Sequence, residues 1–352
     1  MASINLFVAF LLCLGFVTPA GAGVLDAPPT VTTEQIHHTV DLAIGYLQTE
    51  SAAWLNTRGC AACHHVPIPF WALSEALQQG YAIDKKYLDE KFESLLGSKE
   101  KLIASKLING PNDPPDPRPQ GRALNMGLPF LAIAARSFPS LKDEKLQGLK
   151  LIMEEIVQKQ QADGSWEFFS NLRRPPINES QTTDVAWIIL AIAGETGPDS
   201  PESQRAALKK ANAWLDAAQP AALHQDKIQK VLIGTRVGKT RDSMQTTIDE
   251  LLAMQREDGG WSQTVPEQKS DAFATGQTLY VLSLVGYEAN RPEMKRGIDF
   301  LVATQNSDGT WPMISRSTPD GSPGNSKLMS PIYCASSSWA VLALSRLVPK
   351  VN

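Results

Sequence analysis

A spaced pair of Gln and Trp recurs along the chain and constrains its fold more than any other feature. In four segments a Gln is followed, after five intervening residues, by a Trp. The four pairs are Gln48 and Trp54, Gln160 and Trp166, Gln255 and Trp261, and Gln305 and Trp311. The last three contain Asp-Gly shortly before the Trp, which is typical of a turn because Gly tolerates positive φ. Such recurrence predicts a fold in which one supersecondary unit is used several times.

The segments on either side of each pair indicate what the unit is. Amphipathic stretches such as 146–160 and 294–305 end at the Gln, and each is followed by a more apolar stretch such as TTDVAWIILAIA. A helix with one charged face belongs outside, and one that is apolar all round belongs inside. We therefore expect an all-α, single-domain α/α toroid of about six outer/inner helix pairs. Outer helices are expected at 33–50, 85–108, 142–161, 202–218, 240–256 and 291–305, and inner helices at 67–80, 122–137, 180–195, 224–234, 271–287 and 334–348.

The Gln and Trp of each pair are expected to be structural. The Gln amide is predicted to cap exposed N–H groups of the next helix, while the Trp ring packs on that helix. In this interpretation the motif fastens an outer helix to an inner one and takes no part in catalysis.

The segments QQADGSW, MQREDGGW and TQNSDGTW resemble the QW repeats of squalene–hopene cyclases and their relatives, the terpene-cyclase and protein-prenyltransferase toroids. The resemblance concerns the arrangement of helices over most of residues 33–348. It implies the toroid fold but no particular reaction. The Asp-x-Asp-Asp motif that class II cyclases use to protonate an alkene is missing from the sequence. The zinc ligands of prenyltransferases and the Cys-Gly-Glu-Gln thioester sequence are missing as well.

Two lone carboxylates are the nearest candidates for catalysis, Asp184 and Asp271. Aligning the inner helices places Asn125, Asp184, Gly276 and Ser336 at one level near their N-terminal ends. Either these residues form a polar rim on a central cavity, or they are N-caps and first-turn residues that satisfy backbone donors. The rim would also include Arg122, Gln181, Asp271 and Gln277.

A second motif, Cys60-Ala61-Ala62-Cys63-His64, predicts one covalently attached c-type haem. Two thiols at this spacing form thioethers with the haem vinyl groups, and the following His supplies the proximal ligand to iron. The motif is expected in the loop between the first outer and first inner helix. The alternatives are a Cys60–Cys63 disulfide, or a zinc site that adds His64 or His65 and a further ligand from His37, His38 or a carboxylate. The motif with the residues after it also resembles exported bacterial proteins that combine a c-type haem motif with squalene-cyclase-type repeats.

The sixth ligand of the iron is left open by the sequence. An open sixth site would favour haem-dependent oxidation, whereas a Met or His there would favour electron transfer. His65 is adjacent to His64 and is not expected to bind the same iron. His37 and His38 lie far from the Gln48 end of their helix, and they are ordinary helix histidines in the alternative interpretation. Met126, Met313 and Met329 are candidate thioether ligands, although each also suits a core position.

The N-terminus predicts export. Residues 1–22 resemble a secretory signal peptide, with an apolar run too short to span a bilayer comfortably and a small-residue cleavage site. Cleavage would leave 23–352 as a toroid domain in the periplasm or outside the cell, with no integral membrane span. An uncleaved anchor and a lipoprotein through Cys13 are the alternatives. Cys13 is lost on cleavage, so Cys334 is left as a single, buried thiol once the haem takes the other pair.

The charge balance narrows the classes of partner. The net charge is -4 and the sequence contains no run of Lys and Arg. The protein therefore lacks the positive electrostatic potential that would attract nucleic acid. We expect a redox protein whose ring receives an apolar, isoprenoid-like small molecule and whose haem exchanges electrons with a periplasmic partner. A non-catalytic binding scaffold, and a cyclase- or lyase-like enzyme that uses Asp184 or Asp271, are the alternatives. Whether the protein is an enzyme is left open.

Overall fold

The computed structural model describes residues 31–58, 61, 65–105, 107–108, 124–139, 143–167, 175–177, 179–218, 223–264, 269–313, 316 and 326–350. The chain divides after Thr30, and everything described below belongs to the unit Val31–Asn352. The predicted signal peptide and Cys13 lie outside the described residues.

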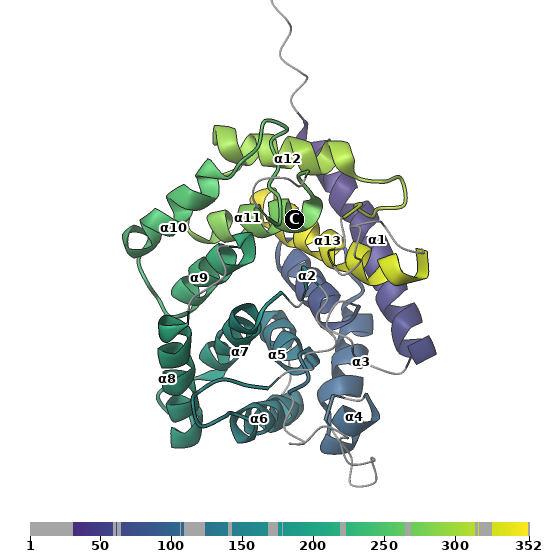
Figure 1. The fold of residues 1–352 in the computed structure, drawn as a ribbon. Coiled ribbons are helices and arrows are strands. Elements are labelled where there is room, and N and C mark those ends of the chain that lie inside the picture. The colour runs from purple at the N-terminus through teal and green to yellow at the C-terminus, as the bar shows by residue number, and fades with distance from the viewer. Residues whose placement is uncertain are drawn as a thin grey trace, which may run out of the picture. The chain divides into compact units, whose positions relative to one another are not determined.

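Helices build this unit in two concentric layers (Figure 1). The inner layer consists of α2 (Pro67–Gln78), α5 (Gly127–Ser137), α7 (Gln181–Glu195), α9 (His224–Arg236), α11 (Ala272–Leu284) and α13 (Ser326–Leu347). The outer layer consists of α1 (Thr33–Arg58), α3 (Lys85–Leu96) with α4 (Lys99–Ala104), α6 (Asp143–Gln158), α8 (Glu202–Ala217), α10 (Arg241–Ala253) and α12 (Pro292–Thr304).

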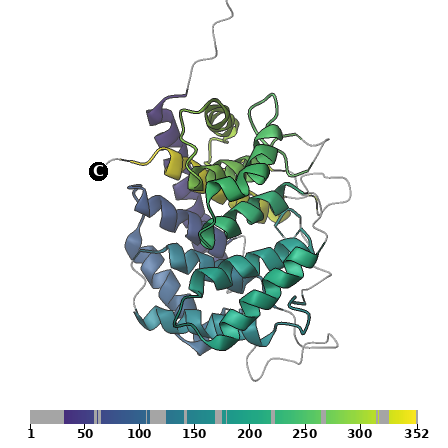
Figure 2. The ribbon, with the colours of Figure 1, turned by 90° about the vertical axis from the view of Figure 1, so that its left-hand side faces the viewer.

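The inner layer is a closed circle. Each inner helix packs on the next in chain order, and the last of them, α13, packs on the first, α2. In the outer layer α12 lies against α1, so the ring closes there as well. The prediction of an all-α toroid of six pairs is confirmed. Figure 2 shows the unit from another side, where the helices of both layers lie stacked along its height.

The two layers differ as their sequences predict. In α7 every side chain from Thr183 to Ile192 is buried, whereas α8 buries only Gln204, Ala207 and Ala211. These three residues lie on one face of α8 because their spacing is three and four. The Trp and Phe side chains of the inner layer meet in the middle of the ring, where Trp339 contacts both Trp71 and Trp187.

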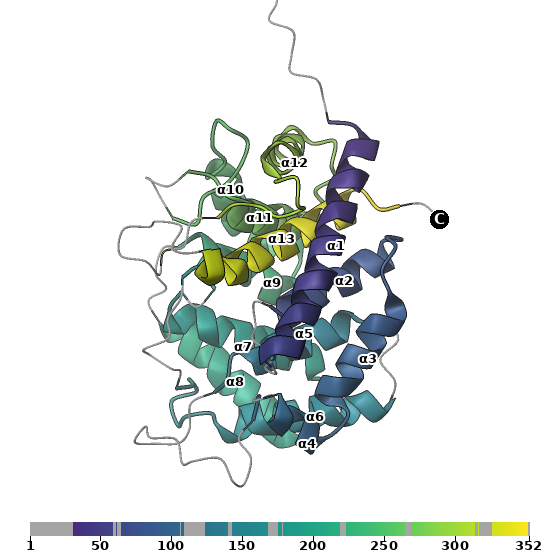
Figure 3. The same cartoon turned by 90° about the vertical axis from the view of Figure 1, so that its right-hand side faces the viewer.

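Four of the predicted helices differ clearly from the observed ones, among them the second inner helix, which begins at Gly127 and not at 122. The first outer helix continues to Arg58, eight residues beyond the expected end, and Figure 3 shows it as one long helix. The second outer segment breaks into α3 and α4, where the Ser98 side chain caps α4. The last inner helix begins at Ser326, earlier than expected. Within the described residues, no helix combines the length and the apolar character that crossing a bilayer requires.

Candidate functional site

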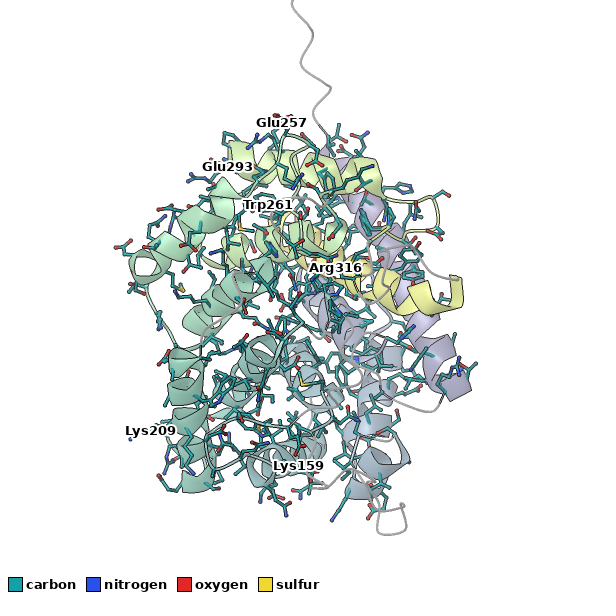
Figure 4. The ribbon with its side chains drawn as sticks, in the orientation of Figure 1. Lys159, Lys209, Glu257, Trp261, Glu293 and Arg316 are labelled. Atoms are coloured by element: carbon teal, nitrogen blue, oxygen red, sulfur yellow. The ribbon has the colours of Figure 1, made fainter. Side chains whose placement is uncertain are left out.

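The last three Gln–Trp motifs fasten neighbouring outer helices to each other. In the third repeat, Gln255 Nε2 donates to the carbonyl of Gly259 and to that of Glu293 in α12, both at 2.8 Å. The Trp261 indole donates to Leu251 O of its own outer helix at 2.6 Å. Figure 4 shows Trp261 between α12 and α11, and Glu257 at the outer edge beside α12. The prediction that the Gln caps N–H groups is therefore wrong, because the amide nitrogen donates to carbonyls.

The same contacts recur in the other two turns. Gln160 Nε2 donates to Ala207 O of α8 at 2.9 Å, and Gln305 Nε2 donates to Thr39 O of α1 at 2.8 Å. Trp166 and Trp311 donate to Ile156 O and Leu301 O of their own helices, each at 2.7 Å. The bond from Gln305 joins the last outer helix to the first and so closes the outer layer.

The turn glycines allow this close approach. Gly164, Gly259 and Gly309 have φ of 98°, 86° and 85°. A Cβ on any of them would lie 2.5 Å from a carbonyl oxygen of the next outer helix. Any other residue would therefore be strained in its backbone and would also collide with the neighbouring helix.

The backbones of the Trp residues also bind the inner layer. Trp261 N donates to Thr275 Oγ1 at 2.9 Å, and Trp261 O accepts from Asp271 N at 3.0 Å. Ser336 Oγ donates to Trp311 O at 3.0 Å. Each of these motifs is thus a structural junction between helices.

The first Gln–Trp pair does something different. Gln48 and Trp54 both lie within α1, so the expectation that this outer helix ends at residue 50, between them, is wrong. The intervening residues TESAA contain no Gly that could leave the helix. Gln48 Oε1 instead accepts from Asp84 N at 3.2 Å, just before α3. The Trp54 ring stacks on His65 with 3.6 Å between ring centroids.

The predicted haem residues Cys60, Cys63 and His64 lie outside the described residues. Helix α1 ends at Arg58 and α2 begins at Pro67, so the motif falls between these two helices in the chain. Ala61, within the motif, is buried, and its N–H donates to Ser105 O at 3.2 Å. The carbonyl of Ala61 lies only 2.9 Å from where a Cβ on Gly127 would be. Ala61 is thereby held beside the start of α5.

The candidates for the sixth iron ligand differ in their position relative to Ala61 and in their burial. Met126 is buried and directly precedes Gly127, the residue that approaches the Ala61 carbonyl. His37 lies near the other end of α2, with its ring 5.7 Å from that of Tyr81, and His38 is exposed. Met313 is buried just after the fourth Gln–Trp turn. The side chain of Met329 lies outside the described residues.

His65 is fully buried between α1 and α2. In addition to its stacking on Trp54, its Nε2 lies 3.4 Å from Glu50 Oε1. The side chain is therefore held by α1.

Asp271 is the N-cap of α11. Its Oδ1 accepts from Ala274 N at 2.9 Å, and its Oδ2 accepts from Gln263 Nε2 at 2.6 Å. Burial raises the pKa of Asp271 to about 6, against the lowering effect of these hydrogen bonds. Arg316 Nε donates to Gln263 Oε1 at 2.9 Å and its guanidinium pairs with Glu179, so Asp271 belongs to a network that joins the loops at this end of the ring.

The residues aligned with Asp184 mostly have structural partners. Asn125 Oδ1 accepts from Gly127 N at 2.8 Å, and a Cβ on Gly276 would lie 2.6 Å from the Trp339 backbone. Asp184 itself is buried in the first turn of α7, and the Thr183 carbonyl beside it accepts from Gln229 Nε2 at 2.8 Å. These contacts favour the N-cap and first-turn interpretation. The catalytic role of Asp184 or Asp271 stays a prediction.

The remaining members of the proposed rim are dispersed. Gln181 is exposed, and Arg122 lies outside the described residues. Gln277 is fully buried, and neither atom of its amide has a hydrogen-bond partner within the part of the chain that the structure describes.

A cavity of about 410 Å³ lies at the opposite end of the ring, where the inner helices end. All six inner helices contribute to its wall. We call it the C-terminal mouth. Its polar and aromatic lining includes Trp71, Glu75, Arg136, Arg236, Tyr280 and Arg346.

Glu75 is the acidic group of the C-terminal mouth. Its Oε1 accepts from the Tyr280 hydroxyl at 2.5 Å and from the Trp71 indole at 2.6 Å. Burial raises the pKa of Glu75, while these two bonds and the charges of Arg346 and Arg236 oppose that rise. Burial also raises the pKa of Tyr280, with a further rise from the neighbouring Glu75. The phenol therefore stays protonated and donates.

Three arginines of the C-terminal mouth come from the last turns of α5, α9 and α13. Arg136 Nε lies 3.8 Å from Glu195 Oε1. Sequence reasoning missed this cluster because its members are up to 271 positions apart in the chain (Glu75 and Arg346). One signal was available, since Glu75 is the only charged residue in the apolar helix PIPFWALSEALQ.

Comparison with known proteins supports the architecture. Residues 225–347, which span α9 to α13 almost entirely, match the family model of the squalene-hopene cyclase C-terminal domain. This match supports the cyclase/prenyltransferase-type toroid superfamily. No curated protein matches the chain.

Proposed function

We propose that the protein is an exported c-type haem protein with one haem, carried by Cys60 and Cys63 and ligated by His64. The observation that carries the proposal is the Cys-x-x-Cys-His sequence in a segment whose described residue, Ala61, is buried and hydrogen-bonded to Ser105. The position of Ala61 supports the proposal because it is the residue next to Cys60 in the motif. Export through residues 1–22 belongs to the same proposal, because it would bring the cysteines to the periplasm.

The residues around the motif fit such a group. Met126 is buried and precedes Gly127, the residue that approaches the Ala61 carbonyl, and we propose that its thioether would be the second ligand of the iron. His65 is engaged with Trp54 and Glu50, which leaves His64 as the imidazole of the motif. When bound, the haem supplies one-electron redox chemistry, and the protein's contribution is to orient it and to shield one side from water. With its sixth position filled, it serves electron transfer with a periplasmic redox partner.

Absorption spectra of the exported protein, oxidised and reduced, test the assignment. We expect c-type bands, and haem stain that stays with the polypeptide on a denaturing gel. Cys60→Ala with Cys63→Ala should abolish the stain. Met126→Ala should move the ferric spectrum towards high spin. Met153 is also buried but lies on α6, and Met153→Ala should not change the spectrum. Stain that survives loss of both cysteines contradicts the proposal.

A zinc site is the second candidate, and one observation favours it. Glu50 lies beside His65, so Cys60, Cys63, His65 and Glu50 together have the composition of a tetrahedral site. Metal analysis of the purified protein separates the two. One zinc per chain, lost in Glu50→Gln and accompanied by no haem stain, would replace the haem proposal.

The apolar, isoprenoid-like ligand is a separate proposal. Its support is the set of aromatic rings that meet inside the toroid, including Trp71, Trp187 and Trp339. Titration with farnesol should quench tryptophan fluorescence at saturable, stoichiometric concentrations. An unchanged spectrum would favour a scaffold with no such ligand.

A cyclase- or lyase-like enzyme is compatible with the toroid. It requires Asp184 or Asp271 to act on a substrate. Asp184→Asn and Asp271→Asn should abolish turnover in that case, and should leave the haem spectrum unaffected.

A further inference from the structure

The C-terminal mouth has no part in the proposed haem chemistry, yet it gathers charge from separate helices. Arg136, Arg236 and Arg346 lie on α5, α9 and α13, which are alternate members of the inner circle. All three border the same cavity. A guanidinium carries five N–H donors and no acceptor, so this arrangement directs many donors into one space.

Helix ends account for only part of this arrangement. A cation in the last turn of a helix is stabilised by the partial negative charge of that helix end. That effect explains why each of these helix ends carries a positive side chain. It does not explain why two of the three guanidinium groups have no hydrogen-bond partner in the described part of the chain. Among the described residues, no hydrogen bond or ion pair engages Arg236 or Arg346, whereas Arg136 approaches Glu195.

Glu75 adds a directed group to the same space. Both of its protein donors, Tyr280 and Trp71, bind one oxygen, Oε1. No described residue bonds the other oxygen. Because burial raises the pKa of Glu75, the carboxyl keeps its proton at a pH where an exposed Glu has lost it. A protonated Oε2 then donates a hydrogen bond.

We propose that the C-terminal mouth binds a small organic oxyanion, a molecule with a carboxylate or phosphate group, through Arg236 and Arg346. Guanidinium groups recognise both kinds of oxyanion through paired N–H donors. Glu75 supplies a further contact to an oxygen of the same molecule. The cavity of about 410 Å³ lies within the usual range for small-molecule sites. The proposal does not depend on the haem.

Calorimetric titration of the full chain with inorganic pyrophosphate and, separately, with succinate tests the site. The ionic strength is matched with sodium chloride. We expect one molecule to bind per chain. Binding of pyrophosphate but not succinate would indicate a ligand with a phosphate group, and binding of succinate but not pyrophosphate would indicate a carboxylate. Arg236→Gln and Arg346→Gln should each weaken binding about tenfold or more, as expected for loss of a charge-assisted hydrogen bond. Arg241→Gln, an exposed arginine on α10 that stacks over Tyr287, should leave binding unchanged.

A second measurement isolates Glu75. The charged or titratable groups facing it are Arg346 from α13, Arg236 from α9 and Tyr280 from α11, and Arg136 from α5 borders the same cavity. Binding should weaken as pH rises through the pKa of Glu75, because its ionisation adds a negative charge to the site. Glu75→Gln stays neutral, so the ratio of its affinity to that of the wild type should rise with pH. Taking this ratio at each pH cancels the titration of the probe.

Two results would overturn the proposal. One is no binding of either probe up to about 10 mM, beyond the range of even a weak small-molecule site. The other is binding that Arg236→Gln and Arg346→Gln do not change. In both cases the arginines serve only to offset the helix ends. Circular dichroism of each variant confirms that the ring is intact.

Discussion

The polar groups at the two ends of the ring differ in their hydrogen bonding. Where the inner helices begin, Asp271 accepts from Ala274 and Gln263, and the Gln–Trp turns donate to the carbonyls of neighbouring helices. Where the inner helices end, Arg236 and Arg346 border a cavity and have no hydrogen-bond partner among the described residues. Polar groups with partners inside the protein hold the ring together. Polar groups directed into a cavity are available for a ligand.

This contrast also separates stability from binding. Substitutions at the first end should lower the free energy of unfolding, because they leave buried groups without partners or remove buried rings. Substitutions at the C-terminal mouth should barely affect unfolding. The variants below test that division, beginning with the largest expected effect.

Trp261→Ala should lower the free energy of unfolding by about 3–5 kcal/mol, as expected for removing a fully buried aromatic ring. The variant also loses the indole bond to Leu251 O, which joins the turn to α10. Urea unfolding followed by circular dichroism measures the loss. Glu257→Ala, exposed in the same turn, is the control and should change stability by less than about 0.5 kcal/mol. Equal effects in the two variants would mean that the turn is not a junction.

His224 should make the first end of the ring sensitive to acid. It is buried, and burial lowers its pKa to about 3, with a further lowering by Lys227. Its Nε2 lies 2.7 Å from Thr278 Oγ1, which itself donates to Ala274 O, so we assign the proton of the neutral ring to Nε2. Protonation is therefore easier in the unfolded chain. Its contribution to stability is complete above about pH 6.5 and is lost as pH falls towards 3, by on the order of 3–5 kcal/mol.

Comparing unfolding of His224→Gln and the wild type from pH 7 to pH 4 checks this sign. The difference in stability should shift in favour of the variant as pH falls. His38→Gln, at an exposed position on α1, should show no such trend. A difference that does not vary with pH would mean that His224 is accessible to protons in the folded protein.

Gln255→Ala and Gln48→Ala compare a repeated turn with its divergent counterpart. Gln255 Nε2 satisfies two carbonyls, so we expect a loss of about 1–3 kcal/mol. Gln48 Oε1 accepts one exposed bond from Asp84 N, and its loss should cost about 0.5–1 kcal/mol. Thermal or urea unfolding measures both. A larger effect at Gln48 would show that the first pair also fastens the ring.

Arg236→Gln should have the smallest effect on unfolding, a loss of about 0.3–1 kcal/mol from the last turn of α9. Its effect on oxyanion binding should be far larger, which is the separation that the two ends imply. A strong loss of stability would place Arg236 among the structural residues. Glu75→Gln is the companion variant, because it keeps an acceptor for Tyr280 and Trp71.

Helix positions were the most predictable part of the fold. The apolar run of α7 and the one-sided charge of α8 specify an inner and an outer helix directly. The end of α1 was not predictable from the Gln–Trp spacing. The first pair has the same spacing as the other three, but it lacks the Asp-Gly that ends their helices. Without a residue that tolerates positive φ, the backbone has no reason to leave the helix at Gln48.

The candidate sites differ in the same way. The haem motif is local in sequence, so five adjacent residues predict it. Asp271 was recognised as a candidate, but its role as N-cap depends on Gln263 and on the loop fold. The C-terminal mouth was missed because Glu75 and Tyr280 are 205 positions apart and meet only when the ring closes. Spacing rules cannot detect such a pair.

The bond from Gln305 to Thr39 has a consequence for the order of events during synthesis. Helices α1 and α2 are made first, but two of their neighbours in the ring, α12 and α13, are made last. Until residue 347 is available, the first helix pair lacks these contacts and keeps one side open. The contact between Trp54 and His65 belongs to that incomplete pair throughout this interval, so it forms without support from the last two helices.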